Sequence, residues 1–226
     1  MKIYNTTFNK YIALSLSILT IITFSIAIAT PPISGFFCQS NCIDYPYLNI
    51  TSRFPRDYIW MFPAIVLTMI YMIWTYSIQN ITEDSRKLFS RIAVGFAVSA
   101  SLILILNYFV QITVIQASLL NNEIHGIPLW TQYNENGLFI AFEEIGYIFM
   151  SIGFLFTAFA LAKDNKKEKR IRWILISSFI LTIASLFFVS ITRGHQKGYL
   201  FEIIVISIDW LTLIVIGFMS MNLYKK

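Results

Sequence analysis

Six long runs of apolar residues, separated by short polar segments, dominate the pattern of this chain. The runs cover residues 11–30, 58–79, 92–119, 138–162, 173–192 and 199–223. A helix needs about 20 predominantly apolar residues to cross a bilayer, and each run meets that length. Even the longest connection, residues 31–57, is rich in turn residues and too short to hold a second folded domain. The pattern therefore predicts an all-α integral membrane bundle of six transmembrane helices, with residues 1–226 forming one domain.

Composition excludes a soluble domain. The chain is 57% hydrophobic and only 13% charged, with a mean hydropathy of +0.66, whereas soluble domains run at roughly 25% charged residues. We therefore expect the lipid bilayer as the main partner. The sequence pI of 9.2 does not indicate nucleic-acid binding, because the basic residues lie in short segments between apolar runs rather than in a stripe.

The basic residues predict the orientation. Positive charge is enriched in cytoplasmic loops. With the N-terminus in the cytoplasm, four of the 17 Lys and Arg residues lie outside, namely Arg53, Arg56, Arg193 and Lys197. The other thirteen lie inside: Lys2, Lys10, Arg86, Lys87, Arg91, Lys163, Lys166, Lys167, Lys169, Arg170, Arg172, Lys225 and Lys226. We therefore predict a multi-pass protein of the cell membrane with both termini cytoplasmic and residues 163–172 as a basic inner loop.

The first apolar run could also be interpreted as a signal peptide. Its segment Ala27-Ile28-Ala29 fits a signal-peptidase site, so residues 1–29 could be a cleaved leader. The run is longer than the usual 7–15 residues of a leader core, and Pro31 and Pro32 mark a plausible helix end. A retained helix is the favoured reading, and cleavage stays open.

Four carboxyl side chains interrupt the last three runs: Glu143, Glu144, Glu202 and Asp209. A charge at the bilayer centre costs at least ~2.5 kcal/mol, so such residues usually face a protein interior or a cavity. Asp209 lies deepest and must be protonated or have a partner. Asn107 or Gln111 could supply a hydrogen bond to it, whereas Arg193 is better placed for Glu202.

Helical spacing groups several polar positions. Asn107 and Gln111 are four residues apart and continue a stripe of small residues that allows close helix packing. Glu144, Tyr147 and Ser151 share one face, as do Glu202 and Asp209. These positions all map to the outer half or centre of the bilayer, which predicts an outward-opening polar pocket lined by the third to sixth helices. Its candidate residues are Asn107, Gln111, Glu143, Glu144, Tyr147, Arg193, Glu202 and Asp209. The structural alternative is that the acids and amides only tie helices together.

Cys38 and Cys42 are the two cysteines of the chain, and both lie in the predicted outer segment 31–57. A short disulfide is the favoured reading in an oxidising compartment. A redox-active pair, free thiols, and a zinc site with His125 and His195 remain open, although the spacing matches no compact zinc motif. We expect no metal. The outer segment 120–137 contains Trp130 and Tyr133, which could fold back onto the membrane surface.

The segments Phe142-Glu143-Glu144-x-Gly146-Tyr147 and Phe201-Glu202 through Asp209-Trp210 resemble small, uncharacterised prokaryotic multi-pass membrane proteins. The resemblance covers the second half of the chain and implies no particular activity. Gly-rich phosphate loops and zinc-protease or serine-nucleophile motifs are absent from the sequence, so we expect no cofactor.

Three function hypotheses follow. The leading one is a protein that binds or transports a small solute or protons, with Asp209 and Glu144 at the core of the site. The second is a non-catalytic accessory, sensor or immunity-type membrane protein, in which the acids lock helices together. The third is a membrane-embedded enzyme that uses Glu143 or Glu144 in acid–base chemistry and Asp209 as a second acid.

Overall fold

The computed structural model describes residues 6–31, 33–35, 38, 40–163, 165–194 and 196–224. Throughout this described part, every regular element is helical, and six helices are long and apolar enough to cross a membrane. The expectation of an all-α chain with six such helices is confirmed. They are α1 (Thr6–Ala29), α2 (Met61–Ile81), α3 (Lys87–Val110), α6 (Leu138–Ala160), α7 (Lys166–Arg193) and α8 (Leu200–Ser220).

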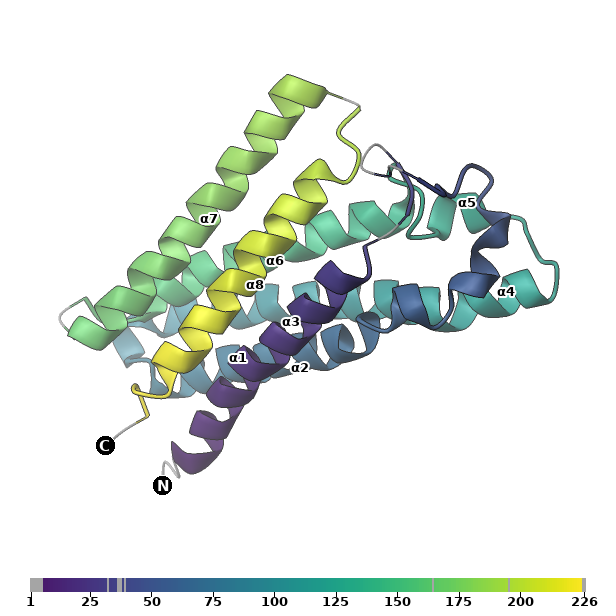
Figure 1. The fold of residues 1–226 in the computed structure, drawn as a ribbon. Helices are drawn as coiled ribbons and strands as arrows, with labels where there is room; N and C mark the ends of the chain where they lie inside the picture. The colour runs from purple at the N-terminus through teal and green to yellow at the C-terminus, as the bar shows by residue number, and fades with distance from the viewer. Residues whose placement is uncertain are drawn as a thin grey trace.

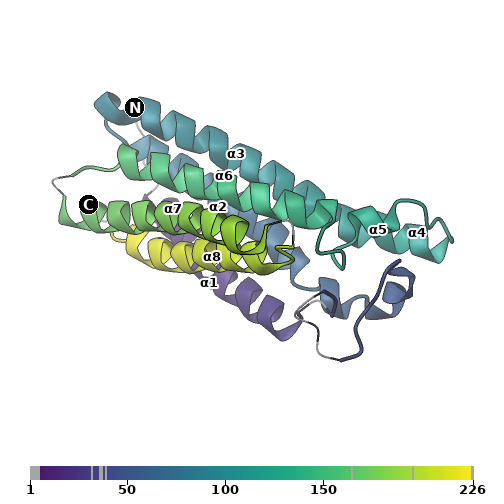
Figure 2. The same cartoon turned by 90° about the horizontal axis from the view of Figure 1, so that it is seen from above.

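The long helices form a closed ring. Each one packs against the next along the chain, and α1 packs against α8 to close the ring. Helix α6 also contacts α8 across the interior. Figure 1 shows α1 entering and α8 leaving at the same end of the bundle, and Figure 2 shows this from above. An even number of crossings places the two ends together.

Short helices and turns cover the opposite end. This cap contains the 3₁₀ turns Leu48–Arg53 and Arg56–Tyr58, α4 (Gln116–Leu120) and α5 (Ile127–Trp130). Helix α3 passes into α4 through a π-helical turn at Gln111–Ile115, a feature often found at functional sites. The predicted run 92–119 is therefore one nearly continuous helix with a local widening.

Tyr133 corrects one expectation about the cap. Its side chain is 0% exposed, and its hydroxyl donates a 2.7 Å hydrogen bond to Oδ2 of Asp57. It therefore packs inside the cap and does not lie on a membrane surface. Burial raises the pKa of Tyr133 well above its usual value, and the nearby Tyr58 and Asp57 raise it further. The hydroxyl thus remains a hydrogen-bond donor at neutral pH.

The basic segment 163–172 is a second correction, because most of it is helical. Helix α7 begins at Lys166, where the side chain of Asn165 accepts a 3.0 Å hydrogen bond from the backbone N–H of Lys167. Glu168 in the first turn also favours a helix N-terminus. The predicted loop is thus reduced to the residues around position 163.

Glycines bring the helices close together. A Cβ on Gly146 of α6 would lie 2.7 Å from Cδ2 of Leu104 on α3. Between α1 and α8, a Cβ on Gly217 would lie 2.7 Å from the carbonyl oxygen of Ala13, and Ser17 donates a 2.8 Å hydrogen bond to the carbonyl of Ile214. Close approach of this kind supports packing between apolar helices.

Candidate functional site

Glu143 lies at the centre of a buried polar cluster between α3, α6 and α8. Its side chain is 0% exposed. Tyr108 of α3 donates a 2.8 Å hydrogen bond to Oε1 of Glu143, and its hydroxyl lies 3.0 Å from that of Tyr147, one turn further along α6. The other carboxyl oxygen, Oε2, has no hydrogen-bond partner in the described part of the chain.

Glu202 approaches Glu143 from α8. The two carboxyls lie near one another without a hydrogen bond of good geometry, although Glu202 belongs to the first turn of a different helix. Two ionised carboxylates in this position would repel one another. A proton on either one would remove the repulsion and supply the hydrogen bond that Oε2 of Glu143 lacks. The two acids therefore form a close pair of like groups in a largely buried position.

The neighbouring Glu144 has different surroundings. Its carboxylate forms an ion pair with the ammonium group of Lys197, in the connection between α7 and α8. Consecutive helical side chains point about 100° apart, which explains how two adjacent acids meet different partners. Tyr147 and Ser151 follow Glu143 on its face at i+4 and i+8, so the inward line of polar groups starts at Glu143 rather than at Glu144.

Asp209 belongs to a separate, deeper group. Ser151 of α6 donates a 2.7 Å hydrogen bond to its Oδ1, and Ser151 lies 2.8 Å from the hydroxyl of Thr182 on α7. The Ser178 hydroxyl, also on α7, lies near the carboxyl without forming a hydrogen bond of good geometry. Asp209, Ser151 and Thr182 are all 0% exposed. This group joins α6, α7 and α8.

Asn107 and Gln111 do not bind Asp209, and that expectation is wrong. The Asn107 amide donates to the carbonyl of Phe139 at 2.9 Å. The Gln111 amide donates to the carbonyl of Trp130 at 2.5 Å, and its oxygen accepts from the backbone N–H of Gln132 at 3.0 Å. Gln111 satisfies the carbonyl at the C-terminal end of α5, where the last carbonyls lack intrahelical partners. Asn107 instead ties α3 to the first turn of α6. They support the site from the cap.

A cavity of about 330 Å³ lies between α1 and α8, at their ends nearest the cap. Its lining consists of Phe24, Ala27, Ile28, Thr30, Pro31, Ser34, Trp60, Gln132, Phe139, Tyr199, Glu202, Ile203, Ile206, Ser207 and Trp210. Glu202 is the one acidic or basic side chain among these described lining residues. The half-buried Glu202 thus connects the cavity to Glu143.

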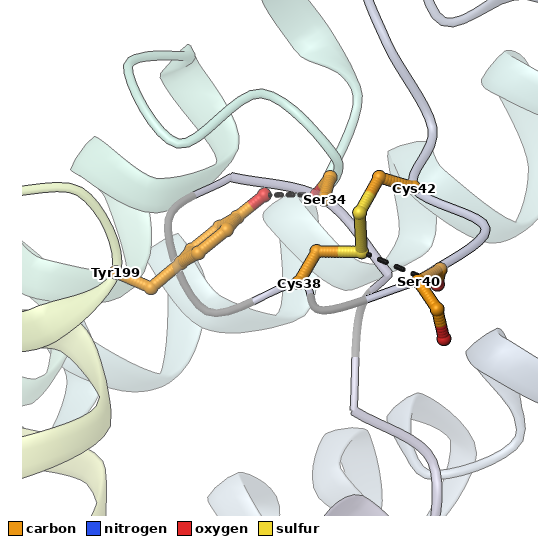
Figure 3. The surroundings of a disulfide bond; sticks show 5 residues. All are labelled: Ser34, Cys38, Ser40, Cys42 and Tyr199. Carbon is orange, nitrogen blue, oxygen red and sulfur yellow. Dashed lines mark hydrogen bonds between the residues drawn. A yellow bond between two sulfur atoms is a disulfide. The ribbon is translucent and has the colours of Figure 1, made fainter.

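The cap segment after α1 covers this cavity. Ser34 and the hydroxyl of Tyr199 lie 2.6 Å apart, and the Tyr199 hydroxyl also donates to the carbonyl of Gln132 at 3.2 Å. Figure 3 shows Ser34 beside the Cys38–Cys42 disulfide, whose Cα atoms are 5.8 Å apart. The disulfide therefore constrains the loop that follows Ser34, a residue of the cavity lining.

The other readings of the cysteines can be compared with this geometry. Free thiols are absent among the described cysteines. Within the described ranges, no group of three or more His, Cys, Asp or Glu side chains is placed to hold a metal ion. His195 lies outside the described residues.

Several residues of the site carried no sequence signal strong enough to find them. Tyr108 continues the buried stripe of α3, one turn beyond Leu104, and a full helical-wheel reading could have included it. Lys197 lies 53 residues from Glu144, and Trp60 lies far in sequence from Trp210, whose ring it contacts, so only the tertiary fold brings these partners together. Arg193 is the last residue of α7.

No protein-family model, curated protein or solved structure matches the chain. The functional argument therefore depends on the geometry of the site.

Proposed function

We propose that this chain is a six-span protein of the cell membrane, with both termini cytoplasmic, that binds a small solute in the outer cavity and exchanges a proton at Glu143 and Glu202. The observation that carries the proposal is the cavity wall at Glu202, whose carboxyl lies beside the buried Glu143. The cavity volume of 330 Å³ matches small-molecule pockets, which span roughly 300–1,000 Å³.

Membrane insertion is supported by the distribution of polarity. Large apolar side chains cover the outward faces, for example Phe187, Phe188 and Ile191 of α7, which are 62%, 61% and 82% exposed. Asn107, Glu143 and Asp209, within the long helices, lie inside. The orientation is supported by basic residues at the end of the bundle that holds the termini, including Lys87 and Lys166.

Proton exchange is supported by the arrangement of the acid pair. Glu202 reaches the cavity, whereas Glu143 is fully buried behind it. Positive charge that enters the cavity would stabilise ionised Glu202 and release the proton that the pair holds. Solute binding and proton release would then be linked.

Asp209 and Glu144 have supporting roles in this proposal. Asp209 is not among the residues that line the cavity, and its hydrogen bonds tie three helices together. Glu144 is neutralised by Lys197. The centre of the proposed site is therefore Glu143 and Glu202, and not the Asp209 and Glu144 pair that depth alone suggests.

Proteoliposomes that enclose a pH-sensitive dye would test the function. Addition of a library of small solutes across a pH gradient should reveal compounds that change the internal pH with the wild-type protein. Glu143→Gln should abolish that change, whereas Glu123→Gln, at an exposed acid of the cap, should preserve it. Two negative results together would favour the accessory role over solute binding: no compound binds or moves protons, and replacement of both acids has no cellular effect.

A membrane-embedded enzyme is a second candidate, because the cavity opens beside a pair of acids. Ile28 and Ile203 line the cavity and are 66% and 49% exposed, so an amphiphile could enter from the lipid side. Mass spectrometry of the bound compound after incubation separates the two functions. Recovery of the unchanged compound favours binding or transport, and a converted compound favours catalysis.

A further inference from the structure

Aromatic rings form the inner wall of the cavity beside Glu202. Trp210 stands between Phe24 and Trp60, with ring centroids 5.4 Å from Phe24 and 6.3 Å from Trp60, both in edge-on geometry. These three side chains come from α8, α1 and the start of α2, and all line the cavity. Tyr199 adds a further ring near the roof. Faces of Trp, Tyr and Phe attract cations through the ring quadrupole.

Charge supports the same ligand class. Glu202 is the one carboxyl in the described lining, and no Lys or Arg of the described residues lines the cavity with it. The nearby Lys197 is engaged with Glu144. A cation in the cavity would therefore meet a carboxylate and aromatic rings, whereas an anion would meet repulsion.

We infer that the cavity binds an organic cation with an apolar substituent, such as a substituted ammonium amphiphile. This inference rests on the proposed solute-binding function and names its substrate class. The ammonium group lies against Glu202 and the rings of Trp60 and Trp210. The apolar substituent leaves between α1 and α8, past Ile28 and Ile203, where it meets the lipid.

A small inorganic cation fits this cavity less well. Mg²⁺ and Ca²⁺ require several oxygen ligands, and the described lining offers one carboxylate among mostly apolar side chains. An alkylammonium group has no such requirement, because its charge is spread over apolar carbons. Aromatic cages with a nearby acid suit this chemistry.

Equilibrium binding of radiolabelled hexyltrimethylammonium to the purified full chain in nonionic maltoside micelles would test the inference. Empty micelles supply the background. Hexanesulfonate is the anionic probe of the same chain length, and 1-octanol is the neutral one. We expect the cation to bind at least roughly tenfold more tightly than either, which is the scale of a desolvated cation–aromatic contact.

Variants separate the charge from the rings. Glu202→Gln keeps the side-chain shape and should weaken cation binding at least roughly tenfold. Phe24→Leu removes one ring at similar volume and should weaken it less. Glu123→Gln in the cap should leave binding unchanged. Thermal unfolding of each variant shows whether a loss of binding reflects a loss of fold.

Two results would overturn the inference. In the first, 1-octanol binds as well as the cation and Glu202→Gln changes neither affinity. The cavity is then a site for apolar compounds, so the cation inference fails while the proposed solute binding stands. If none of the three probes binds to a folded wild-type protein, both the inference and the proposed solute-binding function fail.

Discussion

The hydroxyl of Ser151 on α6 donates a 2.7 Å hydrogen bond to the carboxyl of Asp209 on α8. The same hydroxyl lies 2.8 Å from Thr182 on α7, so one serine connects three helices. The deepest acid of the chain is thereby part of the packing of the bundle. This relationship sets the first prediction.

Asp209→Asn should keep both fold and function. An amide can accept the Ser151 hydrogen bond, so the free energy of unfolding should change by about 1 kcal/mol or less. Asp209→Ala removes the acceptor of the Ser151 hydroxyl and leaves a cavity beside Ser151 and Thr182. It should lower the free energy of unfolding by about 2–3 kcal/mol. Thermal unfolding in detergent and the proteoliposome assay measure the two effects. Loss of proton movement in a folded Asp209→Asn protein would show that Asp209 belongs to the proton-exchange site.

Glu143→Gln should leave the protein folded and remove proton exchange. The Gln side chain can still accept the hydrogen bond from Tyr108, and its amide can donate toward Glu202. Tyr108→Phe, in contrast, leaves Oε1 of Glu143 without its donor and should cost about 1–3 kcal/mol. Solute-dependent pH change and unfolding temperature should therefore separate these two variants. Equal proton exchange by Glu143→Gln and the wild-type protein would contradict the proposed role.

Gly146→Ala should weaken the contact between α3 and α6. The added Cβ would lie 2.7 Å from the Leu104 side chain, and overpacking of this kind typically costs about 1–3 kcal/mol. Gly95→Ala on α3 is the matched control, because nothing lies within 4 Å of its Cβ position. That change should be neutral or stabilising by about 0.5–1 kcal/mol. Addition of Leu104→Ala to Gly146→Ala should cost less than Leu104→Ala alone.

Replacement of both Cys38 and Cys42 by Ser should leave the bundle intact. The disulfide closes a short loop, with a sequence separation of 4, so the chain-entropy argument gives about 2–3 kcal/mol at most. Expression level and unfolding temperature measure this effect. A double variant that fails to accumulate would show that the outer segment has a larger structural role.

Labelling of single cysteines, in the background without Cys38 and Cys42, tests the orientation. An impermeant maleimide added to intact cells should label Asn122→Cys in the cap and leave Ser85→Cys at the other end unlabelled. Both positions are exposed in the structure, so access depends on the side of the membrane. Labelling of Ser85→Cys under these conditions would reverse the predicted topology.

Apolar run length was sufficient to predict the helices, because a run such as 138–162 has few other stable forms in a bilayer. The pattern also placed the acids in the interior. It could not assign their partners. Ser151 and Asp209 are 58 residues apart, and Glu143 and Glu144 point in different directions. Hydrogen-bonding partners depend on how each helix is rotated about its axis, which run length does not determine.

The cavity was beyond prediction for a related reason. Its walls come mainly from α1 and α8, at opposite ends of the described chain, and not from the third to sixth helices together as predicted, since α3 and α7 contribute none of the described lining residues. Phe24 and Trp60 have ordinary roles as apolar residues in their own runs. They become part of an aromatic wall only because the ring of helices closes at α1 and α8.

That closure also orders the assembly of the protein during synthesis. Helix α1 is synthesised long before α8, and in the proposed membrane insertion its buried hydroxyls would wait in lipid. Thr20 and Thr23 each donate to a carbonyl one turn earlier in the same helix, at 2.6 Å and 2.8 Å, so they need no partner helix meanwhile. Ser17 donates to Ile214 of α8 and makes that contact only when the last helix arrives. The proposed binding site is therefore the last part of the bundle to form.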